Sequence, residues 1–80
     1  MTGQSPFAHP LERDVFAVVR YPDGWRILTN GQRWGRFAFR VDAEEAALRL
    51  AAKAEAAGQH AEVLVQDSSG ELSRLDTGNA

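Results

Sequence analysis

The residues best suited to binding chemistry lie in one short stretch, RWGRFAFR, at residues 33–40. Three arginines, one tryptophan and two phenylalanines occupy its eight positions. Guanidinium groups pair with phosphates and aromatic rings stack on nucleobases, so the composition is typical of surfaces that bind single-stranded nucleic acid. It is equally typical of protein interfaces, where Trp and Arg contribute much of the affinity.

The spacing of these residues predicts a strand with two different faces. Side chains alternate along a strand, so Arg33, Gly35 and Phe37 would point toward a core and their neighbours away from it. The residues between them would form a row on the uncovered face of the sheet. An arginine of a neighbouring strand would join this row, and the register decides which one. The candidate binding face therefore consists of Trp34, Arg36, Arg40, Arg26 and Arg20.

The charge of the chain is unevenly distributed. The formal net charge is −2, but residues 20–40 carry +4 and residues 41–80 carry −5. A basic middle segment favours a polyanionic ligand, whereas nucleic-acid binders without sequence preference usually carry a net positive charge. The sequence pI of about 5.6 therefore speaks against nucleic acid as the partner.

Three interpretations of the candidate face stay open. In the first, the arginines form only the solvated side of a small sheet and their stems cover Trp34. In the second, the face binds a protein, either a partner that the sequence does not identify or a second copy of the chain. In the third, it binds nucleic acid through Arg–phosphate pairs and stacking on Trp34.

The sequence offers no residues at the spacing that a catalytic or metal-binding site requires. His9 and His60 have no second ligand nearby in the sequence, and Glu44 and Glu45 are adjacent on an expected helix, where they point in different directions. The serines of DSSG have no positioned base, and no glycines match a phosphate-binding loop. We expect no cofactor, no metal and no enzymatic activity.

Size and composition predict one small globular domain. The chain has 80 residues and no cysteine, which excludes disulfides and fits a reducing compartment. It has no secretory signal pattern and no apolar stretch of membrane-spanning length, so we expect a cytoplasmic protein that does not bind membranes. Residues 1–13 and 77–80 are expected to be flexible tails around a domain at 14–76.

The first half of the domain reads as three antiparallel strands. DVFAVVRY at residues 14–21 and WRILTN at 25–30 flank a Pro-Asp-Gly turn, and NGQ leads into a third strand at 33–41. Trp25 shares its alternation with Ile27, which favours a place in or beside the core.

The second half changes to helical periodicity. Asp42 and Glu45 have the spacing of a capping box, and Gly58 fits the glycine that ends a helix. The predicted apolar stripe is nearly all alanine, so the helix should lie close to the sheet. Its members are Ala43, Ala47, Leu50, Ala51, Ala54 and Ala57.

A final hairpin follows, with AEVLVQ as the fourth strand, DSSG as the turn and ELSRL as a short fifth strand. The predicted fold is α+β: an antiparallel sheet of order β-β-β-α-β-β, with one helix packed on one face.

The arrangement of these motifs resembles a family of small prokaryotic proteins whose activity is not established. The matching positions are the turn Asp23-Gly24-Trp25, the helix start at Asp42, Glu45 and Ala46, and the last turn at Gly70. The resemblance spans about residues 15–76 and implies the same fold. It implies no catalytic residue.

Overall fold

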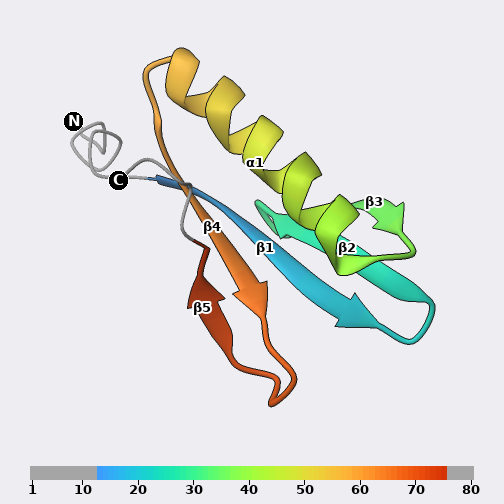
Figure 1. Cartoon of the computed structure of the whole chain (residues 1–80). Helices are drawn as coiled ribbons and strands as arrows, with labels where there is room; N and C mark the ends of the chain where they lie inside the picture. The colour runs from blue at the N-terminus through green and yellow to red at the C-terminus, as the bar shows by residue number, and fades with distance from the viewer. Residues whose placement is uncertain (1–12, 76–80) are drawn as a thin grey trace.

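A five-stranded sheet with one helix on a single face makes up the part of the chain that the structure describes (Figure 1). The computed structural model describes residues 13–75. The elements are β1 (Arg13–Tyr21), β2 (Gly24–Thr29), β3 (Gln32–Phe37), α1 (Arg40–Ala56), β4 (His60–Gln66) and β5 (Leu72–Arg74). The predicted α+β class and element order are confirmed. The predicted tails lie outside the described residues, except for Arg13, which begins β1.

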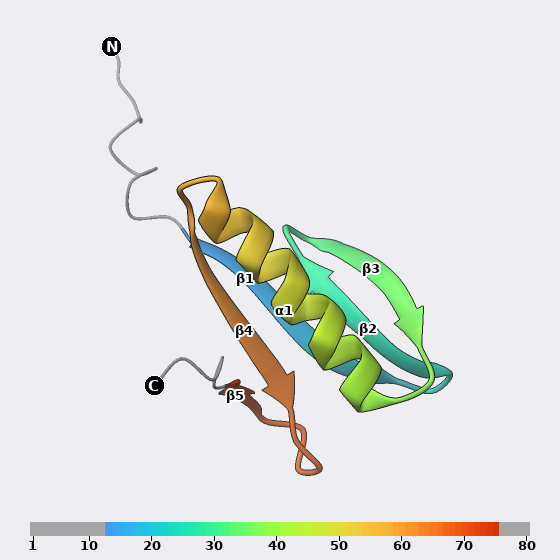
Figure 2. The ribbon, with the colours of Figure 1, turned by 45° about the horizontal axis from the view of Figure 1, so that its top comes forward.

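The sheet is mostly antiparallel, as predicted, but it is mixed, because one strand pair is parallel. Its strand order is β3-β2-β1-β4-β5, and β1 and β4 run parallel, with Phe16 opposite Val63 and Val18 opposite Val65. The other three pairs are antiparallel. The 17-residue helix returns the chain by about 25 Å along the sheet, so β4 starts at the same end as β1 (Figure 2).

The core lies between α1 and the sheet. Val18, Ile27 and Val63 are fully buried beneath the helix, whose own buried residues are all alanines, while Leu48 and Leu50 of the helix pack partly buried against this core. Ala43, Ala47 and Ala51 are buried as predicted, and the buried set also includes Ala46, which the predicted stripe omitted. Of the other predicted members, Leu50 and Ala54 are half-buried and Ala57 is exposed.

The start of α1 differs from the prediction. The helix begins at Arg40, its N-cap residue is Phe39, and no side chain caps it. The Ala43 amide donates to the Phe39 carbonyl at 3.3 Å, so the backbone enters the helix before Asp42, and the expected capping box does not form. Asp42 instead lies in the first turn, where a carboxylate still interacts favourably with the helix dipole.

The end of α1 agrees with the prediction. Gly58 has φ +91°, and its amide donates to the Glu55 carbonyl at 2.9 Å. The Gln59 amide donates to the Ala54 carbonyl at 3.0 Å. Together these two bonds form a Schellman motif, which satisfies carbonyls of the last turn and directs the chain into β4.

A β-bulge in β3 decides which side chains face the helix. Trp25 pairs with Phe37 and Ile27 with Trp34, so two residues of β3, Gly35 and Arg36, lie opposite one residue of β2. Gly35 has φ +74°, the left-handed conformation that a glycine adopts at the first position of such a bulge. The extra residue shifts the alternation by one, and Trp34 and Phe37 therefore point to the same side of the sheet.

Candidate binding surface

Trp34 lies on the helix side of the sheet, which corrects its predicted place on the uncovered face. Its pairing partner Ile27 is part of the core, and paired residues of neighbouring strands share a face. The Trp34 and Phe37 ring centroids are 6.5 Å apart. Because β3 is the edge strand, the helix does not cover Trp34 completely, and the residue is 46% exposed.

Arg40 is also displaced from the candidate face, because β3 ends at Phe37 and Arg40 is the first residue of α1. Its Nε lies 3.1 Å from Oε2 of Glu44, an i,i+4 ion pair on the helix surface. The predicted row of Trp34, Arg36 and Arg40 on one strand face therefore does not exist.

The register of the first hairpin decides between Arg20 and Arg26. Arg20 pairs with Trp25, which packs against the core, and so belongs to the helix side. Arg26 pairs with Val19 and lies between Trp25 and Ile27, so it projects from the opposite side, the uncovered face.

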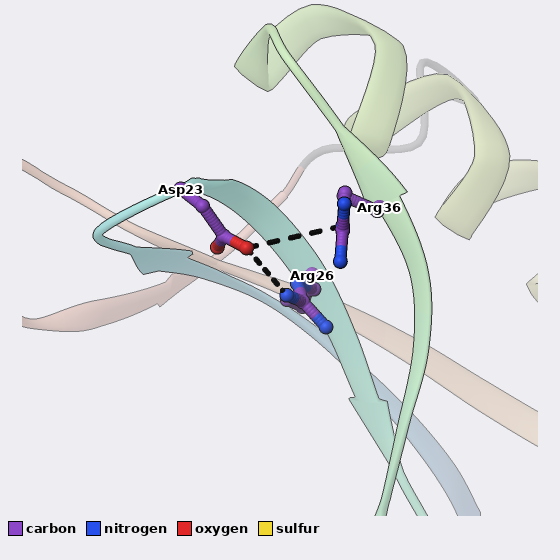
Figure 3. A network of polar contacts seen from close by, with 3 residues as sticks. All are labelled: Asp23, Arg26 and Arg36. Carbon is purple, nitrogen blue, oxygen red and sulfur yellow. Dashed lines mark hydrogen bonds and ion pairs between the residues drawn. The ribbon is translucent and has the colours of Figure 1, made fainter.

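Arg36 joins Arg26 through a shared carboxylate (Figure 3). Oδ2 of Asp23, in the turn between β1 and β2, lies 2.9 Å from Nη2 of Arg26 and 3.8 Å from Nε of Arg36. The hydrogen bond from Arg26, assisted by the charges of Arg26 and Arg36, lowers the pKa of Asp23. The two arginines are thus held together at one end of the sheet.

Tyr21 completes this cationic region. The guanidinium carbon of Arg26 lies 5.4 Å from the centroid of the Tyr21 ring, and that of Arg33 lies 5.7 Å from it. These distances are within the range of cation–π attraction. Arg33 pairs with Leu28 and so lies on the uncovered face, not toward the core as the simple alternation predicted. We call Arg26, Arg33 and Arg36 the basic side.

The centre of the uncovered face is aliphatic, which the sequence interpretation missed. In β1 the alternation directs Val15, Ala17 and Val19 away from α1, because Phe16 and Val18 between them pack against it. Ala17 pairs with both Leu28 and Leu64. We call the six aliphatic side chains on this face the aliphatic patch: Val15, Ala17, Val19, Leu28, Leu64 and Leu72.

A signal for this patch was present in the sequence. The first strand reads DVFAVV, and the fourth reads VLV, so apolar residues occupy both alternation sets. A strand that covers a core on one face and meets water on the other normally alternates apolar with polar residues. The two central strands therefore have an apolar second face, which lies opposite the only helix of the described residues.

The opposite edge of the sheet carries acidic residues. Glu62 and Arg74 form an ion pair across β4 and β5, with Nε and Oε2 2.9 Å apart. In the β4–β5 turn, Oδ1 of Asp67 accepts from the Ser69 hydroxyl at 2.6 Å and from the amides of Ser69 and Glu71. These bonds lower the pKa of Asp67, and the bond from the Ser69 hydroxyl has the largest effect. We call Asp67 and Glu71 the acidic hairpin.

Other kinds of site have less support in residues 13–75. A shallow pocket of about 310 Å³ lies beside the ends of β1 and β4, lined by Arg20, Tyr21 and residues of the last turn. Within the described part of the chain, no three His, Cys, Asp or Glu residues gather as metal ligands. No helix in that part is long and apolar enough to cross a bilayer.

No protein-family model, curated protein or solved structure matches this chain. The resemblance to the small prokaryotic family therefore stays a prediction, and the geometry of the surface carries the functional argument.

Proposed function

We propose that this chain is a small non-enzymatic interaction module that binds a protein partner through the uncovered face of its sheet. The observation that carries the proposal is the aliphatic patch, with the basic side along one flank and the Glu62–Arg74 pair along the other. An apolar centre within a polar rim is the usual composition of protein interfaces.

The edges of the sheet are less suited to binding than its face. The edge strand β5 has only three residues, and the opposite edge strand β3 is bulged at Gly35 and carries two arginines. Short strands, bulges and charged side chains are the features by which proteins prevent strand addition at an edge. A partner is therefore expected on the face.

A probe that needs no knowledge of the partner tests this proposal. Isopropanol is titrated into dilute isotope-labelled protein, and the amide chemical shifts are followed residue by residue. We expect the largest shifts in Ala17, Leu28 and Leu64, because small amphiphilic molecules collect at the apolar centres of interfaces.

Two variants sharpen the result. Leu28→Thr with Leu64→Thr should remove the response, while Val41→Thr, which changes an exposed aliphatic residue at the start of α1, should keep it. Shifts scattered over the whole surface, or centred on the pocket beside Arg20, would refute the proposal.

A second candidate function is nucleic-acid binding by the basic side. Its support is the grouping of Tyr21 with Arg26 and Arg33, which offers an aromatic ring and two guanidinium groups together. The location of Trp34 on the other side of the sheet weakens this candidate, because the predicted Trp–Arg row was its main motif.

Titration with a short mixed-sequence single-stranded oligonucleotide distinguishes the second candidate from the first. Nucleic-acid binding requires amide shifts in β2 and β3 that weaken steeply with added salt. It also requires their loss in Arg33→Gln with Arg36→Gln, but not in the matched helix variant Arg49→Gln with Lys53→Gln. The absence of amide shifts at low salt would reject nucleic-acid binding.

A further inference from the structure

We infer that the partner on the uncovered face is an amphipathic helix of another protein, which lies along β1 and carries carboxylates on both sides of its aliphatic stripe. This inference rests on the proposed function and adds to it the secondary structure and the charge of the partner.

The strands beneath the aliphatic patch are of the kind that helices cover on both faces. β1 and β4 pair in parallel, and each has apolar residues in both alternation sets. Parallel strands normally lie between two layers of helices, and within residues 13–75 α1 supplies one layer. The aliphatic line from Val15 through Ala17 to Val19 is about 13 Å long, which corresponds to about nine residues of helix. A short amphipathic helix of the partner would supply the second layer.

The register places an arginine at each end of an apolar row that crosses the uncovered face. Arg33 pairs with Leu28, which pairs with Ala17. On the other side of β1, Ala17 pairs with Leu64, which pairs with Arg74. The row crosses all five strands, so the two arginines are about 19 Å apart along it. A helix with its side chains is about 10–12 Å wide, so one helix fits between them.

The side chains that the structure describes on this face have a positive net charge. The basic side and Arg74 supply four arginines, against the carboxylates of Asp23 and Glu62, which makes a formal +2. The acidic hairpin does not offset this charge. It projects toward the helix side, because Gln66 and Leu72, the pair next to it, belong to the uncovered face.

The arginines of this face are more accessible than Glu62. The side chains of Arg36 and Arg74 are 71% and 70% exposed, whereas that of Glu62 is 18% exposed. Guanidinium groups therefore reach solvent on both flanks of the aliphatic patch. Carboxylates of a partner would form charge-assisted hydrogen bonds with them and fix its orientation.

The two flanks present their guanidinium groups at opposite ends of β1. The guanidinium carbon of Arg33 lies 5.7 Å from the ring centroid of Tyr21, the last residue of β1. Nε of Arg74 lies 2.9 Å from Oε2 of Glu62, which is level with Val15 near the start of β1. A matching helix therefore has a carboxylate near one end on one side and a carboxylate near the other end on the other side.

A second copy and a nucleic acid fit this face less well. Two copies placed face to face would bring two positively charged surfaces together, and like charges across an interface cost binding energy. A nucleic acid would pair with the arginines, but its bases stack on aromatic side chains and gain little from the aliphatic row. A helix with carboxylates beside an aliphatic stripe uses both the arginines and the row.

Two designed peptides test the inference by amide chemical-shift titration of the isotope-labelled protein. The acidic probe is a helical peptide of about 16 residues with a leucine stripe and glutamates on both sides of it, since shorter isolated helices are marginal in water. The basic probe has the same leucines and a lysine at every glutamate position. We expect the acidic probe to shift the amides of Ala17, Leu28 and Leu64 and to bind about tenfold more tightly than the basic probe.

A double variant with one change on each flank locates the charge pairs. Arg33→Gln with Arg74→Gln should weaken binding of the acidic probe about tenfold, because each flank loses one guanidinium group. Both side chains are exposed, so the fold should stay intact. The control is Arg49→Gln with Lys53→Gln, which makes the same change of net charge on α1 and should leave the affinity unchanged.

The inference is overturned if the acidic probe causes no shifts at millimolar concentration, or if the basic probe binds as tightly. It is also overturned if dilution of the protein alone shifts the same amides, which would identify a second copy as the partner, or if the single-stranded oligonucleotide binds more tightly than the acidic probe. In each case the isopropanol titration still decides whether the face is a binding surface, so failure of the inference and failure of the proposed function are distinguishable.

Discussion

Asp67 shows how one side chain organises a whole turn. Its Oδ1 accepts three hydrogen bonds from Ser69 and Glu71, and these bonds hold its pKa below the ordinary value of 3.8. A carboxyl group with a lowered native pKa stabilises the fold above its unfolded pKa, and this contribution is lost as the pH falls through the native value. The β4–β5 hairpin should therefore loosen in acid.

Removing the strongest of these bonds should raise the pKa of Asp67. We predict that Ser69→Ala, which deletes the hydroxyl donor, moves the carboxyl titration of Asp67 toward 3.8 and reduces the loss of stability below that pH. The measurement is a carbon-detected NMR titration combined with urea unfolding at several pH values. Ser68→Ala is the matched control, and equal effects of the two variants would contradict the role of Ser69.

Gly35 is the residue that turns Trp34 toward the helix side. Its φ of +74° is strained for other residues, and a Cβ at this position would lie 2.7 Å from Cε2 of Phe37. Gly31 has nearly the same φ, +75°, but open space around it. The two glycines therefore separate the cost of the conformation from that of the contact.

We predict that Gly31→Ala lowers the free energy of unfolding by about 1 kcal/mol, from the strained backbone alone. Gly35→Ala should lower it by about 2–3 kcal/mol, because the Phe37 ring must also move out of its packed position. Urea denaturation of both variants checks the difference. Equal losses would mean that the Phe37 ring moves aside without measurable cost.

At the scale of elements, the four buried alanines of α1 allow the helix to lie close to the sheet. Ala47 has no exposed surface, and it belongs to the same core cluster as the fully buried Val18, Ile27 and Val63. A larger side chain at this position must push the helix away from the sheet. Ala52 is on the same helix but exposed.

We predict that Ala47→Leu destabilises the fold by about 1–3 kcal/mol through overpacking. Ala52→Leu, the same substitution on the solvent side of the helix, should change stability by less than about 0.5 kcal/mol. Chemical denaturation of the two variants checks this difference. A tolerated leucine at position 47 would show that the interface between helix and sheet is loosely packed.

The elements themselves were predictable because strong local signals mark them. Asp23-Gly24 and Gly31 mark two turns, and Gly58 marks the helix end, so element order followed from the sequence. The parallel pairing of β1 with β4 did not, because it depends on contacts between residues far apart in the chain. Signals from residues close together in the sequence predict only antiparallel hairpins.

The candidate face was predicted only in part, for a related reason. Arg26 and Arg36 do share one carboxylate, but a single extra residue in β3 moved Trp34 to the other side, and the early start of α1 removed Arg40. A one-residue shift of alternation exchanges the two faces of a strand. Strict alternation does not allow for a bulge, although a glycine within a strand, here Gly35, is a signal for one.

At the scale of the whole molecule, the sheet carries apolar side chains on both faces. Within residues 13–75 one helix covers one of these faces (Figure 2). The helix buries one face, while the aliphatic patch on the other stays partly exposed, with Leu72 48% exposed. Small domains bury a limited share of their surface, and covering this second face with a protein partner would bury more of it.

The most direct test of this account is the titration of dilute isotope-labelled protein with isopropanol, followed by amide chemical shifts. The account predicts shifts in the strands of the uncovered face, around Ala17, Leu28 and Leu64, with the outer residues of α1 such as Arg49 unchanged. Spectra that do not change with added isopropanol, or shifts that centre on the helix, would contradict it.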